Sequence, residues 1–542
     1  MSEPKTQSWK PLIAIALSMV MMYITSFGVN VLISAIVIDL NTTVANLQFV
    51  IVAASLVAGS LMVTAGRLGD KYGKKRIFVS GVILYTIGLI IVVFSPNVMI
   101  FTIAWAAIWP AGMVLIIPTS IALIMYFYEG GQRALAFGIY GAVLSAVSAI
   151  APVVVGFLSD NFGWRLALSL SPIMGLITVL FSLTLPETAK DSKVSIDVPS
   201  VILSVLSFGL FLITTTMAGR FGWLFEKSPL YLGSQEIDLF GMSIVPLLYA
   251  ASIALMGVFL YRGNQLKRRG DSPLLDASLL KNGTFTIGML VGALFFLVNA
   301  GFIFAVSVYL QTGVKFEGLQ TALTTLPFSV VLAILSFATP GLGAKIAPKW
   351  IVIFGSIIMA AGIYLTGQFA GVGMTPMHLL IPMLLAGCGS GLVMAQYTGI
   401  TMMNVAPEQS GEASGLSETM KEIIGQGFAI ALAGSVLFGA VYTSMVNDYA
   451  TLEGEDLSAG EHLQIVVELE DKFQSISEED ETAFVSRLPE KTREAYDQIV
   501  VEAGKNGLKA ALLTMNVILF LIIVLTLLVP ARRLNEAGDY GM

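Results

Sequence analysis

Fourteen apolar runs, each about 20 residues long or longer, dominate this chain of 542 residues. A helix of about 20 apolar residues crosses the ~30 Å hydrocarbon core of a bilayer, and a helix satisfies its own backbone hydrogen bonds there. The runs lie at about 11–38, 47–65, 77–94, 98–128, 135–158, 166–185, 198–217, 239–261, 285–310, 319–338, 350–370, 379–403, 416–442 and 508–529. The sequence therefore predicts an all-α polytopic membrane protein.

The composition restricts the chemistry that such a chain can perform. Hydrophobic residues make up 56% of it and charged residues 12%, against roughly a quarter charged in soluble domains. The single Cys388 cannot form an intrachain disulfide, and His378 and His462 are too few for a histidine-rich metal site. The net charge of −6 does not indicate nucleic-acid binding, because 16 of the 36 acidic residues lie between positions 446 and 508. We expect no enzyme, no metal and no cofactor.

The distribution of basic residues predicts the orientation. An even number of spans puts both termini on one side, and if that side is the cytoplasm it holds 20 of the 30 lysines and arginines. Six of the ten others lie in or beside the long segment after the thirteenth run. Short cytoplasmic loops collect basic residues, whereas long loops translocate largely regardless of charge. We expect cytoplasmic termini and a first helix that is retained.

The stretch between the second and third runs reads GRLGDKYGKKR, Gly66–Arg76. Glycines at 66, 69 and 73 allow a close helix approach or a sharp turn. Asp70 lies in a basic set that consists of Arg67, Lys71, Lys74, Lys75 and Arg76. A plain positively charged loop needs neither this glycine spacing nor the acid. The pattern indicates a tight turn between two membrane helices.

A second copy of this turn lies between the tenth and eleventh runs, where residues 340–350 read PGLGAKIAPKW. Four positions match without a gap: Leu342 with Leu68, Gly343 with Gly69, Lys345 with Lys71 and Lys349 with Lys75. Ala344 replaces the acid. The match indicates two six-helix halves about 270 residues apart, with the seventh and eighth runs inserted between them. Repeated halves are the expected plan of transporters that alternate access.

These features resemble the major facilitator superfamily, and the number of runs resembles its fourteen-helix drug:proton antiporter branch. Further resemblances lie at 129–142 (EGGQRALAFGIYGA), 161–165 (NFGWR), 272–285 and 411–434. The resemblance implies two six-helix repeats plus two inserted helices, in a bacterial-type inner membrane. It also implies a cytoplasmic latch, in which Arg133 pairs with Asp70. The latch residues are Gly66, Arg67, Asp70, Gly73, Arg76 and Arg133.

Three departures from the family pattern concern proton coupling. Thr25 stands where the family's first helix usually carries an acid, and Ala106 stands where its fourth helix usually carries an arginine. Of the antiporter motif GxxxGPxxGG in the fifth helix, only Pro152 and Gly156 remain. The resemblance supports a transporter and leaves open whether protons drive it or whether it is an uncoupled facilitator or lipid transporter.

The predicted cavity is almost free of charge. From the first to the twelfth run no charged residue lies at a helix centre, where a charge costs at least ~2.5–3.5 kcal/mol and is kept for function. Such a cavity suits hydrophobic or amphipathic compounds, lipids included. Asn30, Asn299, Gln311 and Gln396 offer neutral hydrogen bonds, either to the substrate or to a neighbouring helix.

Glu418, Lys421 and Glu422 in the thirteenth run are the charged exception. Their spacings of three and four place them on one helix face. Two interpretations stay open. They form a solvated first turn, with acids favoured by the helix dipole, or they present to the cavity a carboxylate that titrates or contacts the substrate.

The acidic segment 446–508 carries apolar residues at helical spacings in two stretches, 463–473 and 484–500. We expect two amphipathic helices joined near Ser475–Asp480 on the outer side, and a disordered acidic loop is the alternative. The predicted domains are a six-helix lobe at 1–190, two linker helices and a cytoplasmic loop at 191–283, and a second lobe at 284–542 with this insertion.

The sequence predicts a transporter that exports or flips hydrophobic or amphipathic compounds by rocker-switch alternating access. A membrane sensor without transport is the alternative from another class. The substrate and the oligomeric state are not fixed by these patterns.

Overall fold

The structure is a computed structural model of the whole chain. It describes residues 9–531 except 129, 189–196, 227–229, 233–234, 238–240, 270–272, 275–278, 340–341, 343–344, 372, 404, 406–409, 455–457, 459–460, 463–464, 467–468, 470–484 and 487–488. Some helical side chains, those of Asp70 and Arg133 among them, also lie outside the description.

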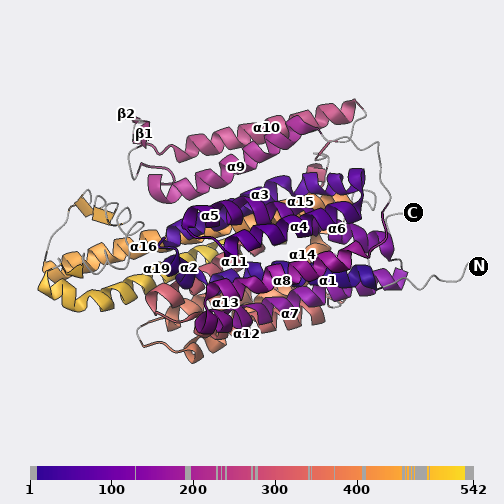
Figure 1. The fold of residues 1–542 in the computed structure, drawn as a ribbon. Coiled ribbons are helices and arrows are strands. Elements are labelled where there is room, and N and C mark those ends of the chain that lie inside the picture. Colours follow the sequence, from indigo (N-terminus) through magenta and orange to yellow (C-terminus); the bar gives the residue numbers. More distant parts are fainter. Residues whose placement is uncertain are drawn as a thin grey trace, which may run out of the picture.

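The described chain is almost entirely helical, and its long helices run side by side (Figure 1). The first group comprises α1 (Lys10–Gly28), η1 (Val29–Val31), α2 (Ile33–Asp39), α3 (Val44–Tyr72), α4 (Lys74–Val93), α5 (Val98–Ile103), the π-helical η2 (Ala104–Ile108), α6 (Trp109–Phe127), α7 (Gly130–Phe162) and α8 (Trp164–Leu183). The middle group comprises α9 (Val198–Phe221), β1 (Leu230–Leu232), β2 (Gln235–Ile237) and α10 (Val245–Arg268).

The last group begins after α10. It comprises η3 (Leu279–Lys281), α11 (Gly283–Val308), the π-helical η4 (Tyr309–Gly313), α12 (Gly318–Ala338), α13 (Pro348–Phe369), η6 (Pro376–Leu379), α14 (Leu380–Met402), α15 (Ser410–Glu422), the π-helical η8 (Ile423–Phe428), α16 (Ala429–Glu453) and α19 (Glu490–Leu527). We call the first and last groups the two halves.

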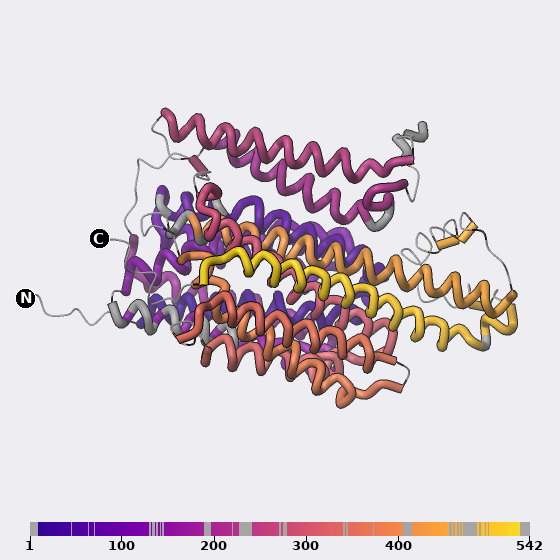
Figure 2. Tube along the Cα trace, turned by 180° about the vertical axis from the view of Figure 1, so that it is seen from behind, coloured from indigo at the N-terminus to yellow at the C-terminus, as the bar shows by residue number. Residues whose placement is uncertain are grey.

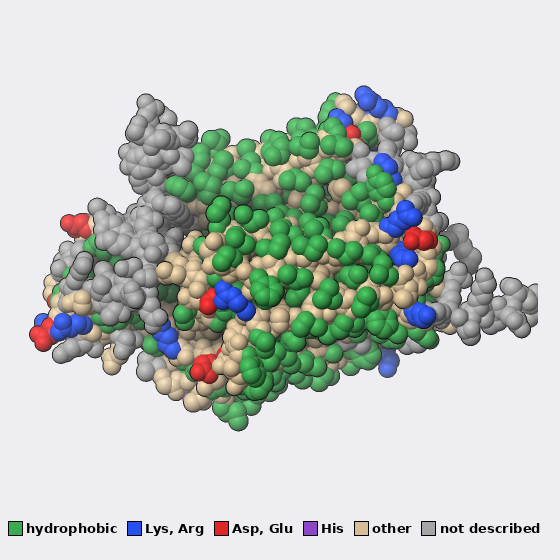
Figure 3. All heavy atoms as spheres, viewed as in Figure 1, with side chains coloured by type: hydrophobic (Ala, Val, Ile, Leu, Met, Phe, Trp, Pro, Cys, Tyr) green, Lys and Arg blue, Asp and Glu red, His purple; other side chains and the backbone are tan. Residues whose placement is uncertain are grey.

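The predicted all-α membrane fold is confirmed. Twelve described spans are long and apolar enough to cross a membrane. The helices α3 and α7, of 29 and 33 residues, contain the shorter apolar stretches Asn46–Met62 and Ala146–Phe162, so the predicted count of fourteen is compatible with the structure. Hydrophobic side chains cover the middle of the visible face, and charged ones gather towards its two ends (Figure 3). This is the surface that a bilayer requires.

The two halves share one packing scheme. In the first half, α1 packs on α7 and α8, α4 packs on α6 and α8, and α3 packs on α6. In the second half, α11 packs on α16 and α19, α13 packs on α14 and α19, and α12 packs on α14. These are the same five pairings when each helix is counted from the start of its half. The internal repeat seen in the turns therefore extends to the helix packing.

Equivalent glycines allow the closest of these contacts. A Cβ on Gly112 of α6 would lie 2.3 Å from the Tyr85 nitrogen of α4, and a Cβ on Gly389 of α14 would lie 2.3 Å from the Gly355 oxygen of α13. Small residues are typical where membrane helices approach closely.

The helices α9 and α10 form a pair beside the halves (Figure 1). α9 packs on α3 and α16, whereas α10 packs mainly on α9. Asp197 joins the pair, because its carboxylate caps the α9 N-terminus at the Ser200 N–H (3.0 Å) and accepts from Arg262 of α10 at 2.7 and 2.8 Å. The hydrogen bonds from Arg262 and then from Ser200 lower the pKa of Asp197 to about 2.

The chain termini define the ends of the bundle. Both lie at one end, which we call the proximal end, and α16 and α19 protrude beyond the other, distal end (Figure 2). The expected separate second helix of the 446–508 segment is instead the start of α19, a single helix of 38 residues. Residues 490–508 contain no proline, so the last membrane helix propagates outward through them. The joint expected at Ser475–Asp480 lies outside the described residues.

Candidate functional site

The turn between α3 and α4 is shorter than the sequence suggests. α3 continues through Gly66 to Tyr72, Gly73 ends it with a φ of 100°, and α4 begins at the next residue. Such a φ is easy for glycine and strained for other residues. Gly69 allows α3 to lie close to α6, because a Cβ there would lie 3.1 Å from the Thr119 methyl carbon. The turn therefore requires Gly73 for its positive φ, and the close packing of α3 on α6 requires Gly69.

Two basic residues of this turn bind the end of α8, within the first half. Lys75 Nζ lies 3.4 Å from Glu187 Oε1 and donates to the Leu183 carbonyl at 3.4 Å. Arg76 Nε donates to Glu187 Oε2 at 3.3 Å. Desolvation opposes ionisation of Glu187, but the two cations outweigh it and lower the pKa of this exposed carboxyl.

The other latch residues lie nearby at the proximal end. Arg67 donates to the Pro273 carbonyl in the segment before α11. Asp70 belongs to the last turn of α3 and Arg133 to the first turn of α7. Their side chains lie outside the described residues, so their pairing stays a prediction.

The second copy of the turn repeats one of these contacts. Lys349, the match of Lys75, donates to the carbonyls of Leu527 at 2.9 Å and Val529 at 3.0 Å. Leu527 is the last residue of α19, the sixth helix of the second half, and Val529 follows two residues later. A cation is favourable at a helix C-terminus, where carbonyls lack partners within the helix. In each half the matched lysine therefore caps the last helix.

The motif residues of α7 lie on the seam with α12. Pro152 is inside α7, and Gly156 follows one turn later. A Cβ on Gly156 would lie 2.8 Å from the backbone of Gly318, the first residue of α12. The glycine thus permits backbone contact between the two halves.

Asp160 fastens the same seam, although no pattern in the sequence predicts its partner. Its Oδ1 accepts the Gly318 N–H at 3.1 Å, and its Oδ2 accepts the Leu319 N–H at 2.7 Å. Glu317, at the N-cap position of α12, makes no capping bond with its own side chain. The N-terminus of α12 is therefore capped by a carboxylate of the opposite half, which also complements the helix dipole.

Two glutamines add hydrogen bonds between the halves. Gln311 of η4 accepts the Ser34 N–H at 3.1 Å and donates to the Asn30 carbonyl at 2.6 Å. Gln48 of α3 donates to the Ile430 carbonyl of α16 at 3.0 Å. These bonds, like the cap on α12, lie towards the distal end. The inner helices α6 and α14 instead pack mainly on helices of their own half.

A charged cluster lies between the halves. Lys421 Nζ is 2.6 Å from Glu418 Oε2 and 4.8 Å from the centroid of the Phe296 ring. Tyr23 of α1 and Tyr140 of α7 interact with the pair electrostatically from the other half. The Lys421 and Glu418 side chains are only 24% and 27% exposed, which favours the cavity-facing interpretation over a solvated turn.

Glu422 completes the cluster as the last residue of α15, and it interacts with both Glu418 and Lys421. The π-helical η8 follows directly. Single π-helical turns are frequent at functional sites because they interrupt the regular hydrogen-bond ladder.

The remaining neutral candidates bond to helices of their own half. The contacts are Thr25 with Ser171 (2.8 Å), Asn299 with Ser390 (2.5 Å) and Gln396 with the Thr339 carbonyl (2.9 Å). For Asn299 and Gln396 this is the helix-packing alternative. Ala106 lies in the π-helical η2. In the described part of the chain, no group of three or more His, Cys, Asp or Glu side chains could hold a metal ion.

Comparison with known proteins gives consistent matches. The family model described as Major Facilitator Superfamily matches residues 15–430. The probable actinorhodin transporter of Streptomyces coelicolor is 27% identical over 84% of this chain and 77% of its own length. The multidrug efflux pump LfrA of Mycolicibacterium smegmatis is 26% identical over 84% of this chain and 85% of its own.

A solved structure shares the fold. It is the inward-facing, occupied form of a bacterial homologue of the human lysosomal transporter Spinster. It superimposes with a TM-score of 0.60 at 16% identity and covers 95% of each chain.

Proposed function

The chain belongs to the major facilitator superfamily of membrane transporters, and from this premise we propose that it exports hydrophobic or amphipathic compounds by alternating access. The family is one of transporters rather than enzymes. Its relatives named as a probable actinorhodin transporter and a multidrug efflux pump support transport of small compounds, and the second name supports export as the direction. The bacterial sources of these relatives support a place in an inner membrane.

The observation that carries the proposal is the difference between the two ends of the interface. Asp160, Gln311 and Gln48 join the halves by hydrogen bonds towards the distal end, whereas towards the proximal end α15 of the second half meets α3 of the first by helix packing. The basic residues favour the proximal end as the cytoplasmic one. The described state is then closed to the outside, and a rocking motion that breaks the distal bonds would release the substrate there.

The substrate class follows from the side chains that lie between the two halves. Asn299, Gln311 and Gln396 are occupied by bonds to other helices, and the central charges are concentrated in the Glu418–Lys421–Glu422 cluster. An interior with so little fixed charge offers mainly apolar contact, which favours neutral or amphipathic compounds, lipids among them. The Lys421 ammonium over the Phe296 ring adds an amphipathic contact point.

Proton coupling, if present, has few candidate groups. Thr25 and Ala106 lack the family's charges, so Glu418 and Glu422 are the carboxylates placed to bind and release a proton during the cycle. We assign coupling to these two residues.

Transport of a hydrophobic dye such as Nile red into proteoliposomes tests this assignment, with and without a pH gradient. The wild-type protein should accumulate the dye only with the gradient. Joint replacement Glu418→Gln and Glu422→Gln should abolish accumulation and spare downhill exchange. Glu490→Gln, at the exposed start of α19, is the control and should retain accumulation.

The other outcomes are equally decisive. Gradient-driven accumulation in the double variant would overturn the coupling assignment. Wild-type transport that is indifferent to the gradient would identify an uncoupled facilitator. No transport of any hydrophobic compound would favour a membrane sensor.

A further inference from the structure

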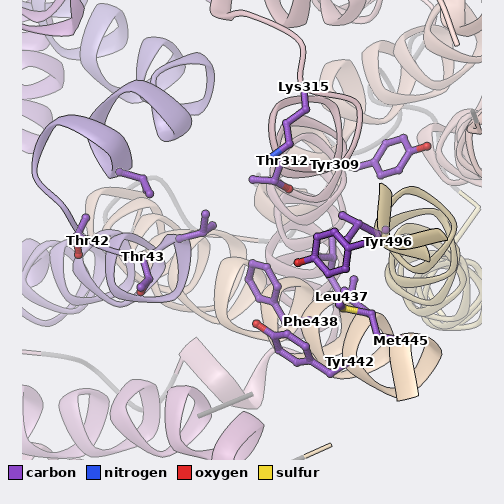
Figure 4. A pocket seen from close by; sticks show the side chains of 16 residues that line it. Thr42, Thr43, Tyr309, Thr312, Lys315, Leu437, Phe438, Tyr442, Met445 and Tyr496 are labelled. Atoms are coloured by element: carbon purple, nitrogen blue, oxygen red, sulfur yellow. The ribbon is translucent and has the colours of Figure 1, made fainter. Parts of the chain in front are cut away.

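A cavity of about 260 Å³ lies at the distal end (Figure 4). One wall is the segment Thr42–Val44, at the start of α3 in the first half. The opposite wall belongs to the second half and includes Tyr309, Lys315, the middle of α16 and the first part of α19. Its lining does not include the Glu418–Lys421 pair, so it is separate from the charged cluster.

The outward extension of α19 completes this pocket. Tyr496, Val500 and Gly504 line it, and all three lie in the part of α19 before the predicted span. Thr492 of the same extension donates to Glu453 of α16 at 2.5 Å, and Asn506 donates to Ser444 at 2.9 Å. The extension is therefore fixed to α16 on both sides of the residues that it contributes.

Backbone irregularities converge on the pocket from both halves. Asn41 (φ 47°) and Lys315 (φ 62°) are the non-glycine residues with positive φ in the described chain. Lys315 lines the pocket, and Asn41 directly precedes its first wall. Tyr309–Gly313 is π-helical. Strained residues and π-helical turns persist mainly where they position functional groups.

The lining has the chemistry of an amphipathic site. Lys315 extends towards the pocket from one side, and the rings of Phe438, Tyr442 and Tyr496 lie across it (Figure 4). Lys315 is the one charged residue among the lining residues, and it forms no ion pair with another described residue. A lysine offers a point charge to an anion, and aromatic rings offer flat apolar surface.

We propose that this pocket binds an amphipathic organic anion, with its carboxylate or sulfonate group at Lys315 and its apolar body against the aromatic rings. The volume lies just below the usual range of small-molecule sites, about 300–1,000 Å³, so the ligand must be compact. Because both halves form the walls, the ligand binds best while the distal ends are joined. Its binding then stabilises that state.

The test uses the full chain in lipid nanodiscs and two fluorescent probes with the same aromatic body. 1-Anilinonaphthalene-8-sulfonate carries an anionic group, and N-phenyl-1-naphthylamine lacks it. The anionic probe should bind saturably to the wild-type protein. Lys315→Gln should weaken the binding of the anionic probe at least about five-fold, as expected for a charge-assisted contact. The affinity for the neutral probe should change by no more than about two-fold. Lys315→Arg should retain the binding of both probes.

A second variant tests the pocket itself. Gly504→Leu should fill part of the pocket and weaken the binding of both probes, because its Cβ would lie in ordinary contact with the Tyr309 ring, at 3.5 Å, and its further carbons would take up space in the cavity. Lys505→Gln is the matched control on the same helix. Lys505 pairs with Glu502 at 3.1 Å and does not line the pocket, so binding should be unchanged.

Two results would overturn the proposal: wild-type affinity for the anionic probe in Lys315→Gln, or full affinity for both probes in Gly504→Leu. The joint replacement of Glu418 and Glu422 should not alter probe binding. Binding is measured without transport, so failure here leaves the proposed export function untouched.

Discussion

Each half has one copy of the turn between its second and third helices. The two copies share a lysine but differ in the acidic residues around it. Lys75 and Lys349 both donate to the carbonyls that end the sixth helix of their half. In the first half Glu187 also binds Lys75 and Arg76, and Asp70 lies in the adjoining turn of α3. In the second copy Ala344 replaces Asp70.

The difference separates a structural role from a functional one. A feature kept in both copies, the lysine cap, is needed to end a helix in either half. A feature of one copy only, the acid among basic residues, is free to take a role in switching. We therefore assign the latch to the first half.

The largest expected effect is on transport. Asp70→Asn should reduce the transport rate about ten-fold or more, because a charge pair that forms in one conformational state is lost. Ala344→Asp, which introduces the acid into the other copy, should leave the rate nearly unchanged. Dye transport in proteoliposomes at matched protein levels measures both. Equal effects of the two changes would remove the distinction between the halves.

A smaller effect, on stability, should be shared by both copies. Lys75→Met and Lys349→Met each remove a cation from a helix C-terminus, at a cost of about 0.5–1 kcal/mol. Thermal unfolding in detergent should show similar decreases in melting temperature for the two variants. Arg76→Gln is the control, because Arg76 binds only the exposed Glu187 in the described structure and should shift the melting temperature less. A clear decrease for one lysine alone would contradict the shared role.

An effect of similar size, but confined to two helices, should appear outside both halves, at the Asp197–Arg262 pair. Its folded pKa of about 2 lies below the usual 3.8, so the stabilisation is present above about pH 4 and is lost as the pH falls towards 2. Asp197→Asn should cost about 0.5–1 kcal/mol and loosen α10 from α9. Hydrogen exchange at pH 7 should increase in α10 but not in α4. Unchanged exchange in α10 would indicate that helix packing alone holds the pair.

The sequence predicts most of the fold because the bilayer imposes a strong rule on length and polarity. Runs of apolar residues place the helices, and Gly73 marks the turn that its positive φ requires. Gly81 and Gly88 recur as Gly355 and Gly362, at the same spacing as Lys75 and Lys349. This repeated pattern is the sequence signal of the close α4–α6 and α13–α14 contacts.

The site is less predictable because its contacts depend on packing between distant segments. Asp160 caps a helix that begins 158 residues later, and nothing next to it in the sequence reveals that partner. Gln311 is visible as a polar residue, but its bonds to Asn30 and Ser34 depend on how the halves meet. The polar start of α19 indicates a helix outside the membrane, yet its continuity with the last span follows only from the absence of a breaking residue.

The central claim is that the two ends of the interface open in alternation and that Asp160 holds the distal end closed. Electron–electron distance measurements test it most directly, with spin labels introduced as cysteines in a Cys388→Ser background. One pair is placed at the distal end, at Phe162 and Leu323, and the other at the proximal end, at Met125 and Phe337. All four residues are at least 46% exposed.

Asp160→Ala removes the cap on α12, worth about 1 kcal/mol, and should shift the equilibrium about five-fold towards the distally open state. The distal distance should lengthen and the proximal distance should shorten in the same fraction of molecules. Asp39→Ala, which removes a distal acid bound to Arg165 within the first half, should change neither distance. Distal lengthening in Asp160→Ala without proximal shortening, or no change at either end, would contradict the account.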